Sequence, residues 1–450
     1  MKKNHTAQHS LFDFYPDHQL GNELKFISEW LDKHPDLIDW VKCDISNLCK
    51  SNAGREAITA ETILRCAILM QTRQLTYDEL EFSLVDSQAC QTFARLDRSK
   101  PLPKKSALQG GISRISDVTW EVINLQLLDG AKTEKVEKGD MLRIDSTVTD
   151  SNIHDPTDSS LLWDCVRTMI RLLENAEELT DETIPWVNHK LGAKRKAHAI
   201  FNTKGQAAKV PLYKNLLNFT HKTLGYIEVA EMIVRQHSVE ALMSEFWHLE
   251  WAHFKPLILN VIDQTERRVL QDEKVPAIEK IFSLFEEHTD IIIKGSRDIQ
   301  YGHKLNLCSG KSGLILDVVI ETGNPADTSC FLPMLERHKE HFGQVPRQCA
   351  ADGGYACQEN LHEAKSFGVE DVAFNKKRGI AIAEMAKSNW VYRKLKNFRA
   401  GIEANISTLK RAWGLSRCAW KGWDHFNSYI WSSVVSYNLT LLARLSLEKV

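Results

Sequence analysis

The sequence predicts a mixed α/β core that follows an all-helical N-terminal region and is interrupted by a long helical segment. Helical patterning fills residues from about 20 to 130. An alternating β-type pattern begins at Met141, and strand patterns return at Asp290. A chain of 450 residues is long enough for two or three domains, or for one domain with a large insertion. The expected parts are an N-terminal helical domain (1–135), the first part of the core (136–158), a helical basic insertion (159–287) and the remainder of the core with C-terminal helices (288–450).

The composition fits a soluble protein whose positive charge is concentrated in a few places. Apolar residues make up 43% of the chain and charged residues 26%, while the net charge is only −2. Lys and Arg nevertheless dominate three blocks, Arg95–Arg114, Thr183–Ile227 and Lys376–Lys421, and the second block contains no Asp or Glu. Three basic blocks in a nearly neutral chain predict localised positive surfaces.

Cysteine usage and the absence of targeting signals indicate the cytoplasm. The ten cysteines form no CxxC pair and no zinc-type spacing, so we expect reduced thiols. Residues 1–10 are polar and show no secretion signal. The uncharged run near the end, His425–Ala443, carries Asn, Ser, Thr and Tyr throughout, which predicts a buried amphipathic helix rather than a membrane span.

The N-terminal region shows a helix start and a basic turn. Thr76 and Glu79 have the spacing of a capping box. Lys104 and Lys105 precede a short helix, and a second helix follows near Ile115–Leu128. This pattern resembles a helix-turn-helix DNA reader with a basic pair at its mouth, and a plain helical bundle with a basic loop explains it equally well.

The first strand and the segment after it have contrasting patterns. MLRIDSTVTDSNI alternates apolar and polar residues and carries Asp145 inside the predicted strand. The following helical stretch extends through IEKIFSLFEEH and contains the acid-free block KLGAKRKAHAIFNTKGQAAKVPLYK, with Lys194, Arg195 and Lys196. A solvated loop is the simpler interpretation of that block, but its complete lack of acids favours a phosphate-facing surface.

The second half of the chain alternates strands and helices. DIIIKG precedes a hairpin formed by YGHKLNLCSG and LILDVVIETG, and a helix follows with an N-cap near Asp327. A short buried strand then ends at Asp352, before Gly353 and Gly354, and one more helix and strand (DVAFN) complete the pattern. In this order the strand that holds Asp145 and the strand before Asp352 can lie side by side.

A long helix from Ser388 to Gly414 carries one acid among many cations. Arg399, Glu403 and Lys410 are four and seven residues apart, so they share one face of the helix. Taken alone, this pattern is typical of an exposed helix with an Arg–Glu pair that stabilises it by a few tenths of a kcal/mol.

Three carboxylates become notable through their positions: Asp145 and Asp352 on neighbouring strands and Glu403 on the helix that packs across them. Converging carboxylates repel one another unless cations neutralise them. Mg²⁺ is the natural partner, because carboxylate and phosphate oxygens are its preferred ligands. Two such ions activate an attacking oxygen and stabilise the leaving one in phosphoryl transfer.

The segments RIDST, CAADGGY and FRAGIEANISTLKRAWGL, in this order, resemble the DDE insertion-sequence transposases with an RNase H-like catalytic core, of the ISNCY type. Many relatives carry Tyr-x2-Arg-x3-Glu-x6-Lys on the last helix. Arg399, Glu403 and Lys410 match this spacing, whereas Lys396 stands at the Tyr position. The YGHK opening of the hairpin and the GNPAD turn are further points of likeness.

The resemblance implies a function and a role for each site residue. Asp145 would contact both of two Mg²⁺ ions, for which Mn²⁺ substitutes, and Asp352 and Glu403 would each complete one ion. Lys410 and Arg399 would contact phosphates near the cut end of double-stranded DNA. The implied enzyme binds the terminal inverted repeats of its element, cleaves at the ends and joins the 3′-hydroxyls to target DNA, as a homodimer associated with the nucleoid.

Other interpretations stay open from the sequence. The chain could be a nuclease of the same fold that never joins strands, or a DNA-binding protein that has lost catalysis. A glycosidase using Asp145 and Asp352 would give no reason for the basic blocks. His338 and His341 lie three apart on a predicted helix without an apparent third metal ligand, so we expect a solvated face. Trp413, Trp420 and Trp423 suit either base stacking or core packing. Asp150, His154 and Asp155 suggest a polar loop.

Overall fold

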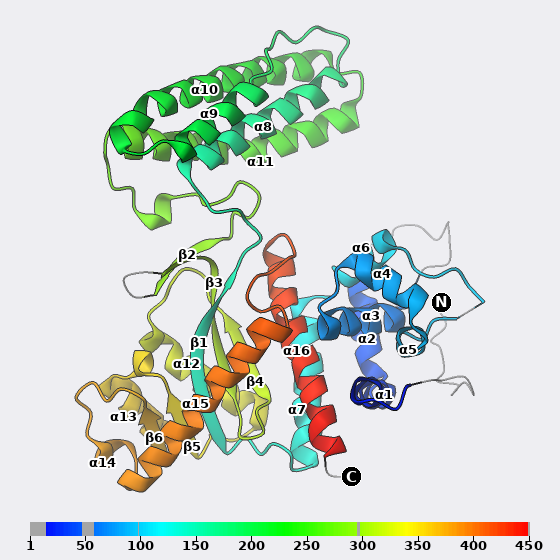
Figure 1. Cartoon of the computed structure of the whole chain (residues 1–450), viewed down its shortest axis with the longest axis vertical. Coiled ribbons are helices and arrows are strands. Elements are labelled where there is room, and N and C mark those ends of the chain that lie inside the picture. Colours follow the sequence, from blue (N-terminus) through cyan, green and yellow to red (C-terminus); the bar gives the residue numbers. More distant parts are fainter. Residues whose placement is uncertain (1–14, 47–57, 98, 295–297, 449–450) are drawn as a thin grey trace. The chain divides into compact units, whose positions relative to one another are not determined.

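A computed structural model describes residues 15–46, 58–97, 99–294 and 298–448 (Figure 1). Residues 1–10, for which we expected no secretion signal, lie outside this set. The chain divides into two compact units. The core unit combines Met1–Asn152 with Ile292–Val450, and the inserted unit is Ile153–Ile291.

The described N-terminal residues of the core unit are helical, as the sequence predicts. The helices are α1 (Gln19–Asp32), α2 (Asp36–Ser46), α3 (Ala60–Arg73), α4 (Tyr77–Asp86), α5 (Gln88–Phe93), α6 (Lys105–Ile112) and α7 (Asp117–Thr133). The predicted capping box at Thr76 and Glu79 is present at the start of α4. Thr59 caps α3 and Ser116 caps α7 by accepting backbone N–H groups of their first turns.

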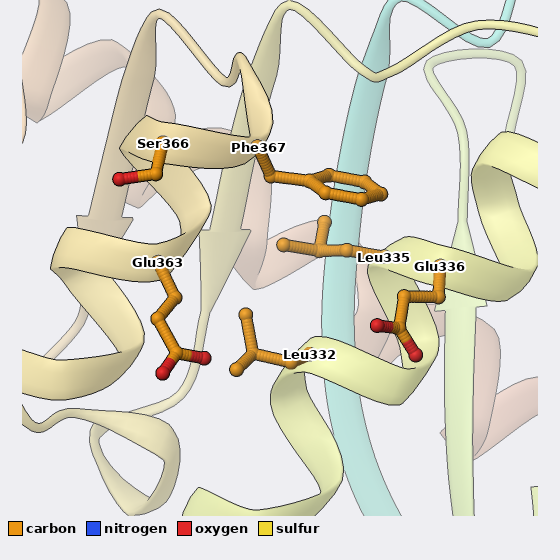
Figure 2. Close-up of a pocket in the computed structure, with 6 residues that line it drawn as sticks. All are labelled: Leu332, Leu335, Glu336, Glu363, Ser366 and Phe367. Carbon is orange, nitrogen blue, oxygen red and sulfur yellow. The ribbon is translucent and has the colours of Figure 1, made fainter.

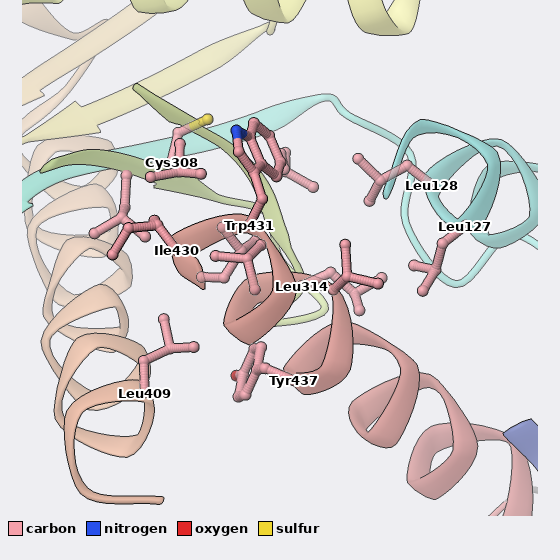
Figure 3. Close-up of a cluster of buried hydrophobic side chains, with 14 of the residues drawn as sticks. Leu127, Leu128, Cys308, Leu314, Leu409, Ile430, Trp431 and Tyr437 are labelled. Atoms are coloured by element: carbon pink, nitrogen blue, oxygen red, sulfur yellow. The ribbon is translucent and has the colours of Figure 1, made fainter. Parts of the chain in front are cut away.

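The last helix, α16 (Trp423–Leu447), packs against α7 and α3 and joins the N-terminal helices to the core. Figure 3 shows Ile430, Trp431 and Tyr437 of α16 among Leu127 and Leu128 of α7 and side chains of the sheet. Every residue from Phe426 to Thr440 is buried, so the prediction of a buried helix is confirmed, but the predicted amphipathic character is wrong because the helix is covered all round. None of the described helices is both long and apolar enough to cross a bilayer.

One mixed sheet forms the centre of the core unit. Its strands are β1 (Met141–Asp150), β2 (Asp290–Lys294), β3 (Asp298–Ser309), β4 (Ile315–Ile320), β5 (Gln348–Ala351) and β6 (Asp371–Phe374). The order is β2-β3-β1-β5-β6, with β4 paired to β3 in the predicted hairpin. β1 is antiparallel to β3 and parallel to β5, with Ile144 opposite Ala351. The two strands that lead to Asp145 and Asp352 are therefore neighbours, as predicted.

Four helices accompany the sheet: α12 (Asp327–Phe342), α13 (Gln358–Phe367), α14 (Ile382–Met385) and α15 (Asn389–Ala412). α12 begins at Asp327, and its N-cap is Ala326, one residue before the predicted cap. α15 begins after Ser388, whose side chain accepts the Val391 N–H, and Gly414 follows the helix with φ +74°. α15 packs across β1, β5 and β6 (Figure 1).

The inserted unit is a bundle of four helices: α8 (Asp158–Glu177), α9 (Lys190–Asn202), α10 (Gln206–His237) and α11 (Ala241–Thr265). These helices pack around a hydrophobic core of their own (Figure 1). The acid-free block forms α9 and the start of α10.

The helix predicted through IEKIFSLFEEH is wrong, because that segment contains only the 3₁₀ turn Ala277–Glu279. Two side chains take the backbone groups that a helix would use. Gln264 Oε1 accepts the Ile281 N–H at 2.9 Å, and Ser283 Oγ accepts the N–H groups of Phe285 and Glu286 at 3.1 Å.

Candidate active site

The three predicted acids come from three elements that meet at one end of the sheet. Asp145 lies within β1, Asp352 directly follows β5, and Glu403 lies in the middle of α15. Because β1 and β5 are parallel neighbours and their pairing ends at Ile144 and Ala351, the next residues, Asp145 and Asp352, lie side by side, while β1 continues beside β3. The crossing of α15 supplies the third carboxylate.

One guanidinium joins all three carboxylates. Arg399 Nη1 lies 3.2 Å from Asp145 Oδ2 and 3.3 Å from Asp352 Oδ1, and Nη2 is hydrogen-bonded to Glu403 Oε1. The Arg399 side chain is 7% exposed, whereas that of Glu403 is 60% exposed. The site is therefore buried on its arginine side and open to solvent on its glutamate side. We call these four residues the acid site.

Asp352 is held in its ionised form. Burial alone would raise its pKa, but the Gly353 N–H, the Asn375 amide, Arg399 and the Gly354 N–H all favour the charged carboxylate, so that its pKa lies below the usual range. The glycines also allow a close approach. A Cβ on Gly353 would lie 2.6 Å from the Lys376 Cβ, and one on Gly354 would lie 2.2 Å from an Asp327 carboxylate oxygen.

A second buried arginine positions α15 over β1, and the sequence analysis missed it. Arg143 Nε donates to Ser309 Oγ at 2.6 Å, Nη1 to the Phe398 carbonyl at 3.1 Å and Nη2 to Asn405 Oδ1 at 2.8 Å. The guanidinium lies over Gly401, where a Cβ would meet Nη1 at 1.8 Å. Two features of the sequence could have indicated this role. Arg143 lies two residues before Asp145, on the same strand face, and Gly401 lies inside a predicted helix.

Beside Asp145 lies a further layer of polar side chains. Lys304 is ion-paired with Asp327 and donates to the Pro325 carbonyl at 2.8 Å, although its side chain is only 4% exposed. The Tyr355 hydroxyl donates to Asn306 Oδ1 at 2.7 Å, and burial, followed by Asp327 and Asp145, raises its pKa far above the ordinary value. Lys304 thus donates to Asp327 and the Pro325 carbonyl, and Tyr355 donates to Asn306.

The predicted phosphate contacts are spread over both units. Lys396 is exposed on α15, one turn before Arg399. Lys410 is half-buried, away from the three carboxylates, and its pKa is lowered by burial although Asp150 attracts its charge. Burial raises the pKa of the Asp150 carboxyl, although the nearby positive charges of Lys410 and Arg417 act to lower it.

The remaining predicted contacts lie on helices of the N-terminal region and of the inserted unit. Lys104 pairs with Glu81 at 3.0 Å and Lys105 with Asp78 at 2.6 Å, so the basic pair already has acidic partners. In the inserted unit, Lys194 and Arg195 are exposed on α9 and Lys196 is half-buried. Exposed ion pairs such as the first two are weak, which leaves Lys104 and Lys105 able to exchange partners.

His338 and His341 do not form the solvated face that we expected. His338 is 1% exposed and its Nε2 lies 2.8 Å from the Gly139 carbonyl. Donor atoms of His341, Glu121 and Asp317 lie within 4.8 Å of one another. Arg337 already pairs with both acids, at 2.6 Å from Asp317 and 2.7 Å from Glu121. We call Arg337, Asp317, Glu121 and His341 the Arg337 cluster. It joins α7, β4 and α12.

The predicted tryptophans and His154 have structural contacts, and a cavity lies apart from the predicted site residues. Trp413 is buried, and Trp420 and Trp423 pack on the core, with rings against Tyr429 and Phe426, respectively. His154 pairs with Asp164 at 2.8 Å. A cavity of about 310 Å³ lies between α12 and α13, lined by none of the predicted site residues (Figure 2).

Two segments of the chain match known family models. Residues 289–439 match the Transposase DDE domain, and residues 16–110 match the Transposase domain (DUF772). The chain carries the domains of a DDE transposase. Such domains are typical of insertion-sequence transposases, and the DDE domain implies an RNase H-like core for the mixed sheet. Searches of curated proteins and of solved structures gave no match.

Transposases of the DDE class use divalent metal ions and act on DNA. The acid site of this chain fits such an ion by its donor set. Three carboxylates face one guanidinium, so the site carries an excess of negative charge from oxygen ligands that hard divalent cations prefer. The Nε of Arg399 is buried without a hydrogen-bond partner, so the guanidinium is not fully paired by these carboxylates.

Proposed function

We propose that this transposase binds the terminal inverted repeats of an insertion sequence, cleaves the DNA at the element ends and joins the 3′-hydroxyls to target DNA. The observation that carries the proposal is the meeting of Asp145, Asp352 and Glu403 at one guanidinium, from positions separated by more than 50 residues in the sequence. The ISNCY subgroup stays a prediction from the sequence.

The acid site would hold two Mg²⁺ ions, which Mn²⁺ can replace, with Asp145 touching both and Asp352 and Glu403 one each. Ions held by these residues would supply Lewis acidity to the attacking water or 3′-hydroxyl and to the leaving oxygen. The protein supplies positioning. Arg143 fixes α15 against β1, so that Glu403 is held over the strand acids.

The basic residues outside the acid site would hold the DNA. Lys396, Arg399 and Lys410 lie along α15 and would contact phosphates near the cut, since a cation beside a phosphate fixes the scissile bond. The N-terminal helical domain, with Lys104 and Lys105, and the insertion, with Lys194, Arg195 and Lys196, would bind the repeat. We propose a homodimer that acts in the cytoplasm on the nucleoid, because two element ends are processed together.

Two alternatives make different chemical demands. A glycosidase using Asp145 and Asp352 would act on a sugar and would give no reason for the basic blocks. A nuclease that never joins strands would use the same acids. The two activities are separated by offering a pre-cut 3′-hydroxyl end and a target plasmid, because only a transposase gives a joined product.

The test is cleavage of element-end DNA by purified protein with Mg²⁺ or Mn²⁺. Asp145→Ala should abolish the cut and retain DNA binding. Asp140→Ala, which removes an exposed acid just before β1, is the matched control and should cleave like the wild type. Undiminished cleavage by Asp145→Ala would refute the proposed site. Binding of repeat DNA by the wild type without any metal-dependent cleavage would favour a protein that has lost catalysis.

A further inference from the structure

Two arginines lie under α15, and they differ in how completely their N–H groups are paired. Arg143 donates from Nε, Nη1 and Nη2 to three neutral oxygens, so each of its nitrogens has a partner. Arg399 donates only from Nη1 and Nη2, to three carboxylates, and its Nε is buried without a partner. Opposite charge therefore holds Arg399 in place, whereas complete hydrogen bonding holds Arg143.

We propose that Arg399 is an internal counter-ion that occupies the acid site until metal arrives and then leaves the three carboxylates. This inference rests on the proposed function, because it assigns the same carboxylates to the metal. Asp145 Oδ2, Asp352 Oδ1 and Glu403 Oε1 are the oxygens that Arg399 contacts. A divalent cation needs those oxygens and is repelled by the guanidinium, so the two positive groups compete.

The acid site is open to solvent on one side, so a metal ion can enter there and replace the Arg399 guanidinium. Glu403 is 60% exposed, so a hydrated ion can reach the carboxylates from the solvent side, while Asp145 is 16% exposed and lies deeper. Once released, the guanidinium stays at the mouth of the site, tethered to α15 one turn from Glu403. It can then pair with a phosphate oxygen, which suits its planar fork of donors.

The exchange couples metal to DNA. A phosphate that accepts Arg399 removes the competitor from the acid site and thereby strengthens metal binding. By linkage, metal must strengthen DNA binding by the same factor. The protein without DNA would then bind metal weakly, and the site would be loaded when a DNA end is in place.

The experiment measures Mn²⁺ binding to the full-length protein without DNA, from the electron paramagnetic resonance signal of free Mn²⁺. Arg399→Gln should bind Mn²⁺ at least tenfold more tightly than the wild type, because the ion no longer displaces charge-assisted hydrogen bonds. Arg393→Gln removes an exposed cation from the same helix and should leave the affinity unchanged. A gain of less than tenfold in Arg399→Gln, or a loss, overturns the proposal.

Two further variants keep the test decisive. Adding Asp145→Asn to Arg399→Gln should remove the tight binding, and its persistence would place the Mn²⁺ elsewhere and overturn the proposal. Should Arg399→Gln fail to fold in EDTA by circular dichroism, Arg399→Lys decides. One ammonium cannot span three carboxylates, so its affinity should exceed that of the wild type, and equality overturns the proposal.

These measurements are independent of the DNA reaction. A wild-type protein that cleaves no element end would refute the proposed function and leave the Mn²⁺ comparison as it stands. Equal Mn²⁺ affinities would refute the counter-ion role and leave the cleavage result as it stands.

Discussion

The acid site and the Arg337 cluster are built alike, but only the acid site has the charge and the exposure that suit an active site. In each, an arginine from a helix bridges carboxylates that belong to different elements. The Arg337 cluster has two carboxylates for one arginine, and its Asp317 is 1% exposed. The acid site has three carboxylates for one arginine, and its Glu403 is 60% exposed.

The difference shows that proximity of ligand-type side chains is a poor guide to a metal site. Among the described residues, the donor atoms of Glu121, Asp317 and His341 lie close together, yet Arg337 contacts both carboxylates, and Asp317 is fully buried. In the acid site, the excess of negative charge and the open side leave a role for a further cation. The ratio of acids to fixed cations, together with exposure, separates a structural tie from a candidate active site.

The largest effect that we expect comes from Arg337→Met. It should lower the free energy of unfolding by about 3–5 kcal/mol, because it leaves the buried Asp317 charge without its partner. Urea unfolding measures the loss. Mg²⁺ should not restore the stability, since this ion gives up its water reluctantly to a buried site. Adding Asp317→Leu should recover most of the loss, and a double variant as unstable as the single one would contradict a structural tie.

The matching change in the acid site should behave differently. Arg399→Met leaves three carboxylates that repel one another, which should cost about 1–2 kcal/mol in EDTA, less than at Arg337 because solvent reaches Glu403. Millimolar Mg²⁺ should restore this loss, since a ligand that binds the folded state stabilises it. Equal responses of the two variants to Mg²⁺ would remove the distinction between the clusters.

The fit of α15 on β1 is tested by adding one methyl group. Alanine normally stabilises a helix relative to glycine by about 1 kcal/mol. At Gly401, however, the new Cβ would meet Arg143 Nη1, so Gly401→Ala should lower the free energy of unfolding by about 1–3 kcal/mol and reduce cleavage. Gly130→Ala in α7 is the control. Nothing lies within 4 Å of its Cβ, so it should raise stability, and a similar gain at Gly401 would show that α15 sits loosely.

The smallest effect that we expect is a pH dependence of stability caused by His338, which lies on the same helix as Arg337. Burial lowers the pKa of His338 to about 4, below the ordinary value of 6.5. The unfolded chain therefore binds the proton more readily, and stability is lost as pH falls from 6.5 towards 4. We expect a loss of about 1 kcal/mol between pH 7 and pH 5.5 from this group. Urea unfolding of the wild type and of His338→Gln at both pH values measures this loss. If the free energy of unfolding fell equally in both proteins, the lowered pKa of His338 would not be its cause.

The parts of the site that follow from local patterns could be predicted from the sequence. The spacing of Arg399, Glu403 and Lys410 fixes their common helix face, and the strand order places β1 next to β5. What could not be predicted depends on contacts between distant segments. The contact of Arg399 with both strand acids depends on the angle at which α15 crosses the strands. The hydrogen bonds of Arg143 to α15 depend on the space that Gly401 leaves for its guanidinium. Similarly, the segment around Ile281 has a helical pattern, but its backbone is bound by Gln264.

The long stretch of sequence between β1 and its partner strands has a consequence for synthesis on the ribosome. Asp145 pairs across the sheet with Leu307, and the inserted unit, with a hydrophobic core of its own, is made between them. At about 5–20 residues per second, the ribosome needs roughly 10–40 s to go from Asp145 to Asp352, and longer to reach Glu403. The inserted bundle can therefore fold while β1 still waits for its neighbours. We expect the chain to be nearly finished before the three acids first meet.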